Sequence, residues 1–154
     1  TLFFDFIPLD LGTVAGMRTK FHLYTIPGSV HYRSTRQLVL QGADGVVLVV
    51  DSQPGRMPEN QRCMEDLFEN LLENRIDPDS VPMVLQFNKR DLPEILPIEQ
   101  LQEKLNPEDR YATFEAIAIR GEGVFPTLKG ISSLVLERIG ETAARARDLR
   151  PGAR

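Results

Sequence analysis

The sequence predicts an α/β fold in which a parallel sheet is covered by helices. Strand-like and helix-like segments alternate along the 154 residues, and this alternation is typical of parallel strands joined by helical crossovers. Residues 45–50 are a continuous run of the kind found in strands buried on both faces. Residues 81–87, which begin with the apolar run 81–85, are the next predicted strand. Between them, residues 64–72 place apolar side chains at helical spacing, with acidic side chains on the other side. We therefore expect this helix to pack on the sheet.

The first third of the chain predicts a hairpin followed by a helix. Residues 2–11 are rich in Phe, Ile and Leu, and residues 19–24 form a second short apolar run. The two runs are expected to pair antiparallel across a turn at 12–16. A helix is expected over 30–40, ended by Gly42.

The second half of the chain predicts two more helices and one more strand. Pro97 begins a short helix that ends before Asn106, and residues 114–119 are the last predicted strand. A long amphipathic helix follows, with Pro126 tolerated in its first turn. Its inward positions are Val124, Leu128, Ile131, Val135 and Ile139.

Composition restricts the classes of function. The chain is 42% apolar, which at this length is enough for one buried core. A formal charge of −4 and a pI near 5.2 exclude a typical nucleic-acid binder, because no basic face can neutralise a phosphate backbone. Cys63 is the single cysteine, which excludes an intramolecular disulfide and a cysteine-rich zinc site. The low cysteine count fits a cytoplasmic location. No run reaches roughly 18 apolar residues, so we expect no membrane span.

The most informative segment is 86–93, where a predicted buried strand ends in Asn88, Lys89 and Asp91. Polar groups at the carboxyl end of a parallel strand lie where open α/β sheets bind ligands. Asp91 can accept two hydrogen bonds from the N1–H and exocyclic amine of guanine, while the Lys89 stem lies against the ring and Asn88 tethers the loop. Adenine presents an acceptor in place of the ring N–H, which would cost roughly 1 to 3 kcal/mol. The plainer alternative is a solvated turn with a helix cap at Asp91.

This segment resembles the guanine motif Asn-Lys-x-Asp of the Ras-like small GTPases. Residues 1–139 are similar, more narrowly, to the bacterial gliding-motility (MglA) branch of these proteins, and segments 1–6, 21–28, 45–52 and 86–93 carry the resemblance. The resemblance implies the three-layer P-loop NTPase (Ras-like) fold, an α/β sheet with helices on both faces. It also implies GTP or GDP and Mg²⁺ as ligands, and hydrolysis of GTP to GDP.

The same resemblance assigns roles near the first two strands. Thr1 matches the first-switch threonine, whose hydroxyl binds Mg²⁺. Thr25 stands where most Ras-like proteins have an aspartate of the Mg²⁺ shell, and the gliding-motility branch also has threonine there. Gly28 lets a backbone N–H approach the γ-phosphate because it has no Cβ. Ser29 replaces the glutamine that orients the attacking water and is too short for that role. His31 is the alternative catalytic group, although a histidine on a helix surface is its plainer interpretation.

Ala118 and Ile119 fall where the family has Ser-Ala-Lys, a loop that supports the guanine carbonyl. Ala118 matches the central alanine and Ile119 replaces the lysine. A backbone N–H in this loop can still donate to the guanine carbonyl. Asp51 ends the strand at 45–50. We expect its carboxylate to be a cap rather than a catalytic group.

The phosphate loop of the family is the largest departure. No glycine is followed by Lys-Ser or Lys-Thr, so the sequence has no Gly-x-x-x-x-Gly-Lys-[Ser/Thr]. In the family this loop precedes the position of Thr1. We therefore expect an N-terminally truncated chain that lacks the first strand, the P-loop and the first helix, which leaves neighbouring strands unpaired. The expected parts are a partial small GTPase (G) domain over 1–140 and an Arg-rich flexible C-terminal tail over 141–154.

The predicted function is that of a GTP-binding molecular switch that hydrolyses GTP to GDP to control cell polarity or gliding motility, with impaired nucleotide binding in this fragment. By resemblance, its partners are a Roadblock-type GTPase-activating protein (MglB-like) and polarity effectors. Two alternatives stay open. A degenerate, nucleotide-independent interaction module would explain Ser29, Ile119 and the lack of a phosphate loop. A different α/β enzyme would use Asp51 or His31 at the carboxyl end of the sheet.

Overall fold

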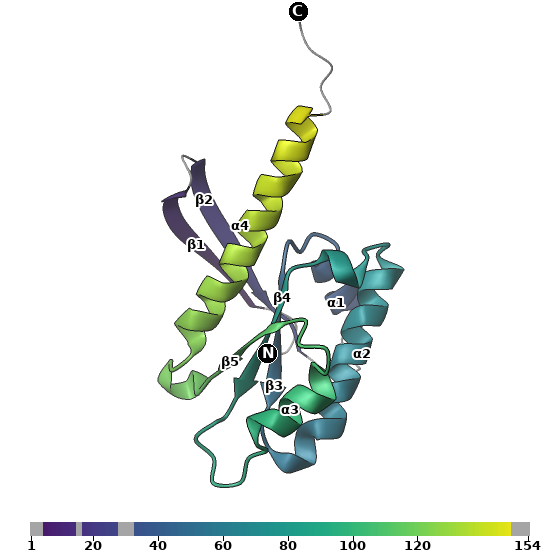
Figure 1. Ribbon diagram of the computed structural model, residues 1–154, viewed down its shortest axis with the longest axis vertical. Helices are drawn as coiled ribbons and strands as arrows, with labels where there is room; N and C mark the ends of the chain where they lie inside the picture. Colours follow the sequence, from purple (N-terminus) through teal and green to yellow (C-terminus); the bar gives the residue numbers. More distant parts are fainter. Residues whose placement is uncertain (1–4, 15–16, 28–32, 149–154) are drawn as a thin grey trace, which may run out of the picture.

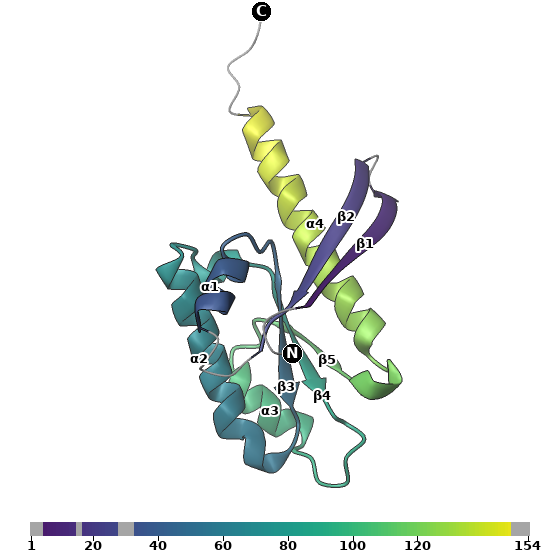
Figure 2. The same ribbon diagram turned by 180° about the vertical axis from the view of Figure 1, so that it is seen from behind.

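The computed structural model describes residues 5–14, 17–27 and 33–148, and Figure 1 shows their arrangement. In chain order, the strands and α-helices are β1 (Asp5–Val14), β2 (Met17–Thr25), α1 (Arg33–Leu40), β3 (Val46–Asp51), α2 (Met57–Glu73), β4 (Met83–Asn88), α3 (Ile98–Leu105), β5 (Ala112–Glu115) and α4 (Val124–Asp148). Strands β3, β4 and β5 form a parallel sheet in that order. Helices α2 and α3 lie on one face of this sheet and α4 on the other (Figures 1 and 2). The predicted α/β class, with helices on both faces of a parallel sheet, is confirmed.

Two apolar clusters hold these layers together. On one face, alternate residues of β3 and β4 meet the apolar stripes of α2 and α3 in a cluster that includes Leu48, Val50, Leu85, Phe87, Leu67, Leu71, Leu101 and Leu105. On the other face, Val84 packs with Ile131 and Val135 of α4. Each Leu or Phe buried in this way stabilises the fold by roughly 1.5 to 3 kcal/mol. The central strand β4 is therefore fixed from both faces.

Strands β1 and β2 form an antiparallel hairpin that is separate from this sheet. The register shifts between Asp10 and Thr13, where Gly12 has a φ of 68° and its N–H donates to Asp10 Oδ1 at 2.8 Å. Glycine adopts this φ without strain and makes a bulge, so β1 continues through part of the predicted turn to Val14. Phe21 of β2 packs on the cluster under α4, beside which the hairpin lies (Figure 2). The predicted antiparallel pair is confirmed, and β1 extends to Val14, into residues predicted to be a turn.

The prediction that residues 45–50 are buried on both faces is wrong at Val49, whose side chain is 54% exposed. Helix α4 covers Val47, but its contact does not reach the carboxyl end of β3. Within the described ranges, β3 pairs only with β4. One edge of β3 therefore presents backbone N–H and C=O groups that no described strand pairs.

The last strand is shorter than predicted. Strand β5 ends at Glu115, and residues 118–120 form a 3₁₀ turn, η4 (Ala118–Arg120), instead of continuing to 119. Gly121, with a φ of 76°, closes this turn, and a β-bridge joins Ile117 to Glu122. The strand-like composition of residues 114–119 is thus overridden by the turn that glycine permits.

Helix α4 continues past Ile139 to Asp148, so residues 141–148 of the predicted tail are helical. Ala and Arg, which dominate this segment, are strong helix formers. The division into a G domain and a tail stays a prediction. Each helix in the described part of the chain is too short or too polar to cross a bilayer.

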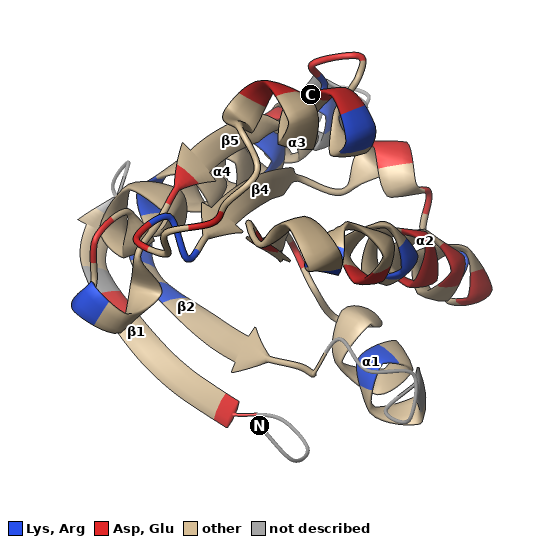
Figure 3. Cartoon of the chain, turned by 90° about the horizontal axis from the view of Figure 1, so that it is seen from below, with Lys and Arg blue, Asp and Glu red and all other residues tan. Residues whose placement is uncertain are grey.

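Charge is unevenly distributed over the helices. Acidic side chains follow one another along α2 (Figure 3), namely Glu59, Glu65, Asp66, Glu69 and Glu73. Such a face repels a phosphate backbone.

Candidate functional site

The candidate site lies at the carboxyl ends of the parallel strands. Asp51, the last residue of β3, is in register with Asn88, the last residue of β4. The loop after β4 contributes Lys89 and Asp91, and the turn after β5 contributes Ala118. Open α/β sheets bind ligands at this edge. The structure thus brings together residues that are far apart in the sequence.

Asn88 joins the two loops that were predicted to contact the base. The Ala118 N–H donates to Asn88 Oδ1 at 3.0 Å. Beside this bond, the Arg90 N–H donates to the Ala116 carbonyl at 3.2 Å. The Asn88 amide therefore fixes η4 against the loop after β4. It also occupies the Ala118 N–H, one of the two backbone donors expected to contact a guanine carbonyl.

Lys89 is held in an unusual conformation at the start of the loop. Its φ is 64°, a left-handed value that is uncommon for a residue with a Cβ and is often found at functional loops. Its Nζ lies 2.7 Å from Asp51 Oδ2. The other carboxylate oxygen, Asp51 Oδ1, accepts a hydrogen bond from the Gln53 N–H at 3.1 Å. The cap at Asp51 was anticipated, whereas its ion pair with Lys89 was not.

Asn60 of α2 holds Asp51 in place. Its Oδ1 accepts from the Asp51 N–H at 3.1 Å, and its Nδ2 donates to the Asp51 carbonyl at 2.8 Å. Asn60 is buried, so this pair of hydrogen bonds is shielded from water. The sequence offered no signal for this contact, because an asparagine inside an amphipathic helix is ordinarily solvated.

Asp91 keeps its carboxylate partly accessible, with 22% of the side chain exposed. The nearest cation is Arg120, whose Nη2 lies 3.8 Å from Asp91 Oδ2. Arg120 also approaches Glu122, with 4.0 Å between Nη1 and Oε1. The sequence did not predict this ion pair, since it depends on how η4 folds back against the loop.

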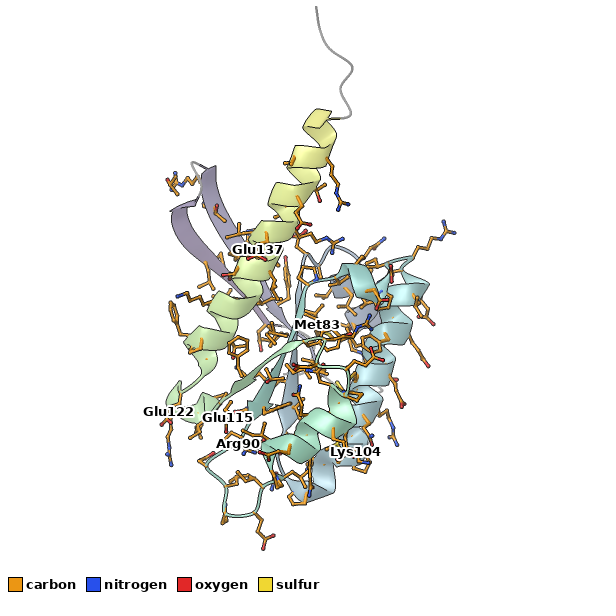
Figure 4. All side chains as sticks on the ribbon, viewed as in Figure 1. Met83, Arg90, Lys104, Glu115, Glu122 and Glu137 are labelled. Carbon is orange, nitrogen blue, oxygen red and sulfur yellow. The ribbon has the colours of Figure 1, made fainter. Side chains whose placement is uncertain are left out.

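Arg90 holds the loop after β4 in place through two side-chain hydrogen bonds. Its Nε donates to Glu115 Oε2 at 3.1 Å and its Nη1 donates to the Leu96 carbonyl at 2.8 Å. Figure 4 shows Arg90, Glu115 and Glu122 at this end of the molecule. The Arg90 side chain is largely buried in this role. The variable position of the Asn-Lys-x-Asp motif is structural in this chain.

The predicted switch residues are described only in part. Thr25 Oγ1 donates to Asp5 Oδ2 at 3.1 Å and accepts from the Asp5 N–H at 3.2 Å, so its hydroxyl closes the open end of the hairpin. Thr1, Gly28, Ser29 and His31 lie outside the described residues. Over 5–14, 17–27 and 33–148, no three His, Cys, Asp or Glu side chains gather as a metal site would require. Thr1, the residue expected to bind Mg²⁺, lies outside these ranges.

Comparison with known proteins finds a matching family model and several similar proteins. Residues 7–135 match the model of the ADP-ribosylation factor family. The chain is 48% identical over 139 residues to the mutual gliding-motility protein MglA of Myxococcus xanthus (strain DK1622), covering 90% of this chain and 71% of that protein. It is 26% identical over 137 residues to the ADP-ribosylation factor-like protein 4C of Homo sapiens and of Mus musculus, covering 86% of this chain and 68% of those proteins.

Proposed function

This chain belongs to the ADP-ribosylation factor family, as a Ras-like small GTPase of the MglA type with the P-loop GTPase fold, and on that premise we propose that Asp91 reads the guanine base of GTP and GDP. The family consists of GTP-binding switches that hydrolyse GTP, with guanine nucleotide and Mg²⁺ as their general ligands. The observation that carries the proposal is the position of the Asp91 carboxylate. It lies partly exposed at the carboxyl end of the central strand, beside a turn that Asn88 holds in place.

The geometry supports a division of roles around the base. Asp91 accepts the N1–H and the exocyclic amine, which adenine cannot offer together. The aliphatic stem of Lys89 covers one face of the ring, whether its ion pair with Asp51 breaks or is kept. Ala118 or Ile119 offers a backbone N–H to the guanine carbonyl. For Ala118, this requires its bond to Asn88 to be exchanged for one to the base.

The remaining site roles are proposals taken from the family. Thr1 binds Mg²⁺, Gly28 senses the γ-phosphate, and Ser29 or His31 handles the attacking water. Thr25 takes part only if its hydroxyl leaves Asp5. We propose that nucleotide binding by these 154 residues is weak, because their sequence has no phosphate loop.

The biological setting is likewise a proposal. The relative that shares 48% identity is named for gliding motility. We propose a cytoplasmic switch for cell polarity or gliding motility that binds a Roadblock-type GTPase-activating protein and polarity effectors. Its nucleotide state would be read on the segments around Thr1 and Gly28.

Isothermal titration calorimetry of the 154-residue chain with GDP and ADP tests the proposal. We expect GDP to bind more tightly by a factor of roughly 5 to 150, the equivalent of one good bidentate base contact. Equal dissociation constants would refute guanine reading. A nanomolar dissociation constant for GDP would refute the proposal that nucleotide binding is impaired.

A second candidate is a nucleotide-independent interaction module. It is favoured by one observation, that both charged groups of the motif already have partners within the chain, Lys89 with Asp51 and Asp91 with Arg120. In that case, a partner protein would bind equally well with GDP, GTP or neither present. The GTPase switch requires its binding to differ between the two nucleotides.

A further inference from the structure

Arg120 lies beside the carboxylate of Asp91, which is the group proposed to bind the guanine base. Its Nη2 lies 3.8 Å from Asp91 Oδ2 across the gap between η4 and the loop after β4. The Asp91 side chain is 22% exposed and the Arg120 side chain 60% exposed. The pair therefore sits at the mouth of the site, where a ligand would meet it.

The guanidinium of arginine and the N1–H and amine edge of guanine present the same chemistry. Both are planar, delocalised groups that offer adjacent N–H donors to a carboxylate. The distance of 3.8 Å is too long for a hydrogen bond, so Arg120 and Asp91 form a loose ion pair. A base that makes two hydrogen bonds to Asp91 would compete with the guanidinium for the same carboxylate.

We propose that Arg120 is an internal competitor of guanine, which occupies Asp91 when no nucleotide is bound and lowers the affinity for guanine nucleotides. The inference rests on the proposed function and adds a specificity-determining residue to that site. When Arg120 is displaced from Asp91 it can still pair with Glu122, whose Oε1 lies 4.0 Å from Arg120 Nη1. The guanidinium therefore keeps one ion partner in the liganded state.

The size of the effect follows from exposure. An ion pair this open to water is weak, so it reduces the fraction of chains with a free Asp91 only modestly. Removing the guanidinium should tighten GDP binding by about two- to fivefold. The gain should shrink in 0.5 M salt, where ions screen exposed charges over roughly 4 to 5 Å.

The test uses the 154-residue chain and three variants. Arg120→Ala removes the competitor, and Arg120→Lys keeps the charge without the planar fork. Arg110→Ala is the charge-matched control, because Arg110 pairs with Asp79 at 2.9 Å instead of with the site. Dissociation constants of GDP and ADP are measured by calorimetry at low and high salt.

We expect tighter GDP binding in Arg120→Ala, an intermediate value in Arg120→Lys, and no change in Arg110→Ala or in ADP binding. Weaker GDP binding in Arg120→Ala would overturn the inference, because Arg120 would then be a ligand of the nucleotide. Unchanged GDP binding would overturn it as well. If the unmodified chain does not prefer GDP over ADP, the proposed function fails instead.

A second measurement needs no nucleotide. In the free chain, the ¹³C resonance of the Asp91 carboxyl group should shift in Arg120→Ala and stay in place in Arg110→Ala. If the Asp91 resonance does not shift in Arg120→Ala, the ion pair between Arg120 and Asp91 is not formed in solution and the inference is overturned, whatever the calorimetry shows.

Discussion

Replacing Gly123 with alanine is expected to lower the free energy of unfolding by at least roughly 4 kcal/mol. Gly123 has a φ of 73°, which L-residues with a Cβ rarely adopt. A Cβ there would lie 1.9 Å from the Glu115 carbonyl oxygen and 2.8 Å from Ala116 Cα. Since both are backbone atoms, the end of β5 would have to move. Urea denaturation followed by circular dichroism measures the change.

Gly121→Ala is the matched control for this prediction. Gly121 has a φ of 76°, but a Cβ there meets no atom within 4 Å. It therefore reports the conformational penalty alone, on the order of 1 kcal/mol. Equal losses in the two variants would contradict the close approach of Gly123 to β5.

Replacing Arg36 with methionine is expected to cost roughly 3 kcal/mol of stability, because it leaves a partly buried carboxylate without its cation. Arg36 of α1 has only 8% of its side chain exposed, and its Nη2 lies 3.5 Å from Asp66 Oδ2 of α2. Its Nη1 also donates to the Pro27 carbonyl at 3.4 Å, next in sequence to Gly28, the residue expected to approach the γ-phosphate. Chemical denaturation gives the loss in the free energy of unfolding.

The Arg36 prediction has its own control and a local readout. The double variant Arg36→Met, Asp66→Leu removes both charges and should recover most of the loss. Cys63 reports on the same region, since burial raises the pKa of its thiol and Arg36 lowers it in part. Because loss of Arg36 raises this pKa and by itself slows labelling by a thiol reagent, faster labelling of Cys63 in Arg36→Met would show that α1 has detached from α2. A loss below roughly 0.5 kcal/mol, typical of a surface change, would contradict the structural role of Arg36.

The elements that follow strong local patterns were predictable. Met83–Asn88 is a strand because its apolar run is buried on both faces, and α3 begins where Pro97 supplies a fixed φ. The position of the polar loop at the carboxyl end of β4 was predictable from residue types, because an Asn, a Lys and an Asp follow a buried strand. Their placement beside Ala118 follows from parallel strand order.

The features that were missed depend on tertiary contacts. Asp51 meets Lys89 because β3 and β4 are paired in register, which spacing in the sequence does not reveal. Arg120 meets Asp91 because η4 interrupts a segment whose composition is strand-like. Val49 is exposed because α4 covers only part of β3.

The central claim, that Asp91 reads guanine, is tested most directly by the base preference of Asp91→Asn. Asparagine offers one acceptor and one donor, which suits the N1–H and the 2-oxo group of xanthine and opposes the amine of guanine. We expect the ratio of the dissociation constants of XDP and GDP, measured by calorimetry, to fall by a factor of roughly 5 to 150 or more. Glu94→Gln, which removes a negative charge from the same loop, should leave the ratio unchanged. An unchanged ratio in Asp91→Asn would contradict the claim.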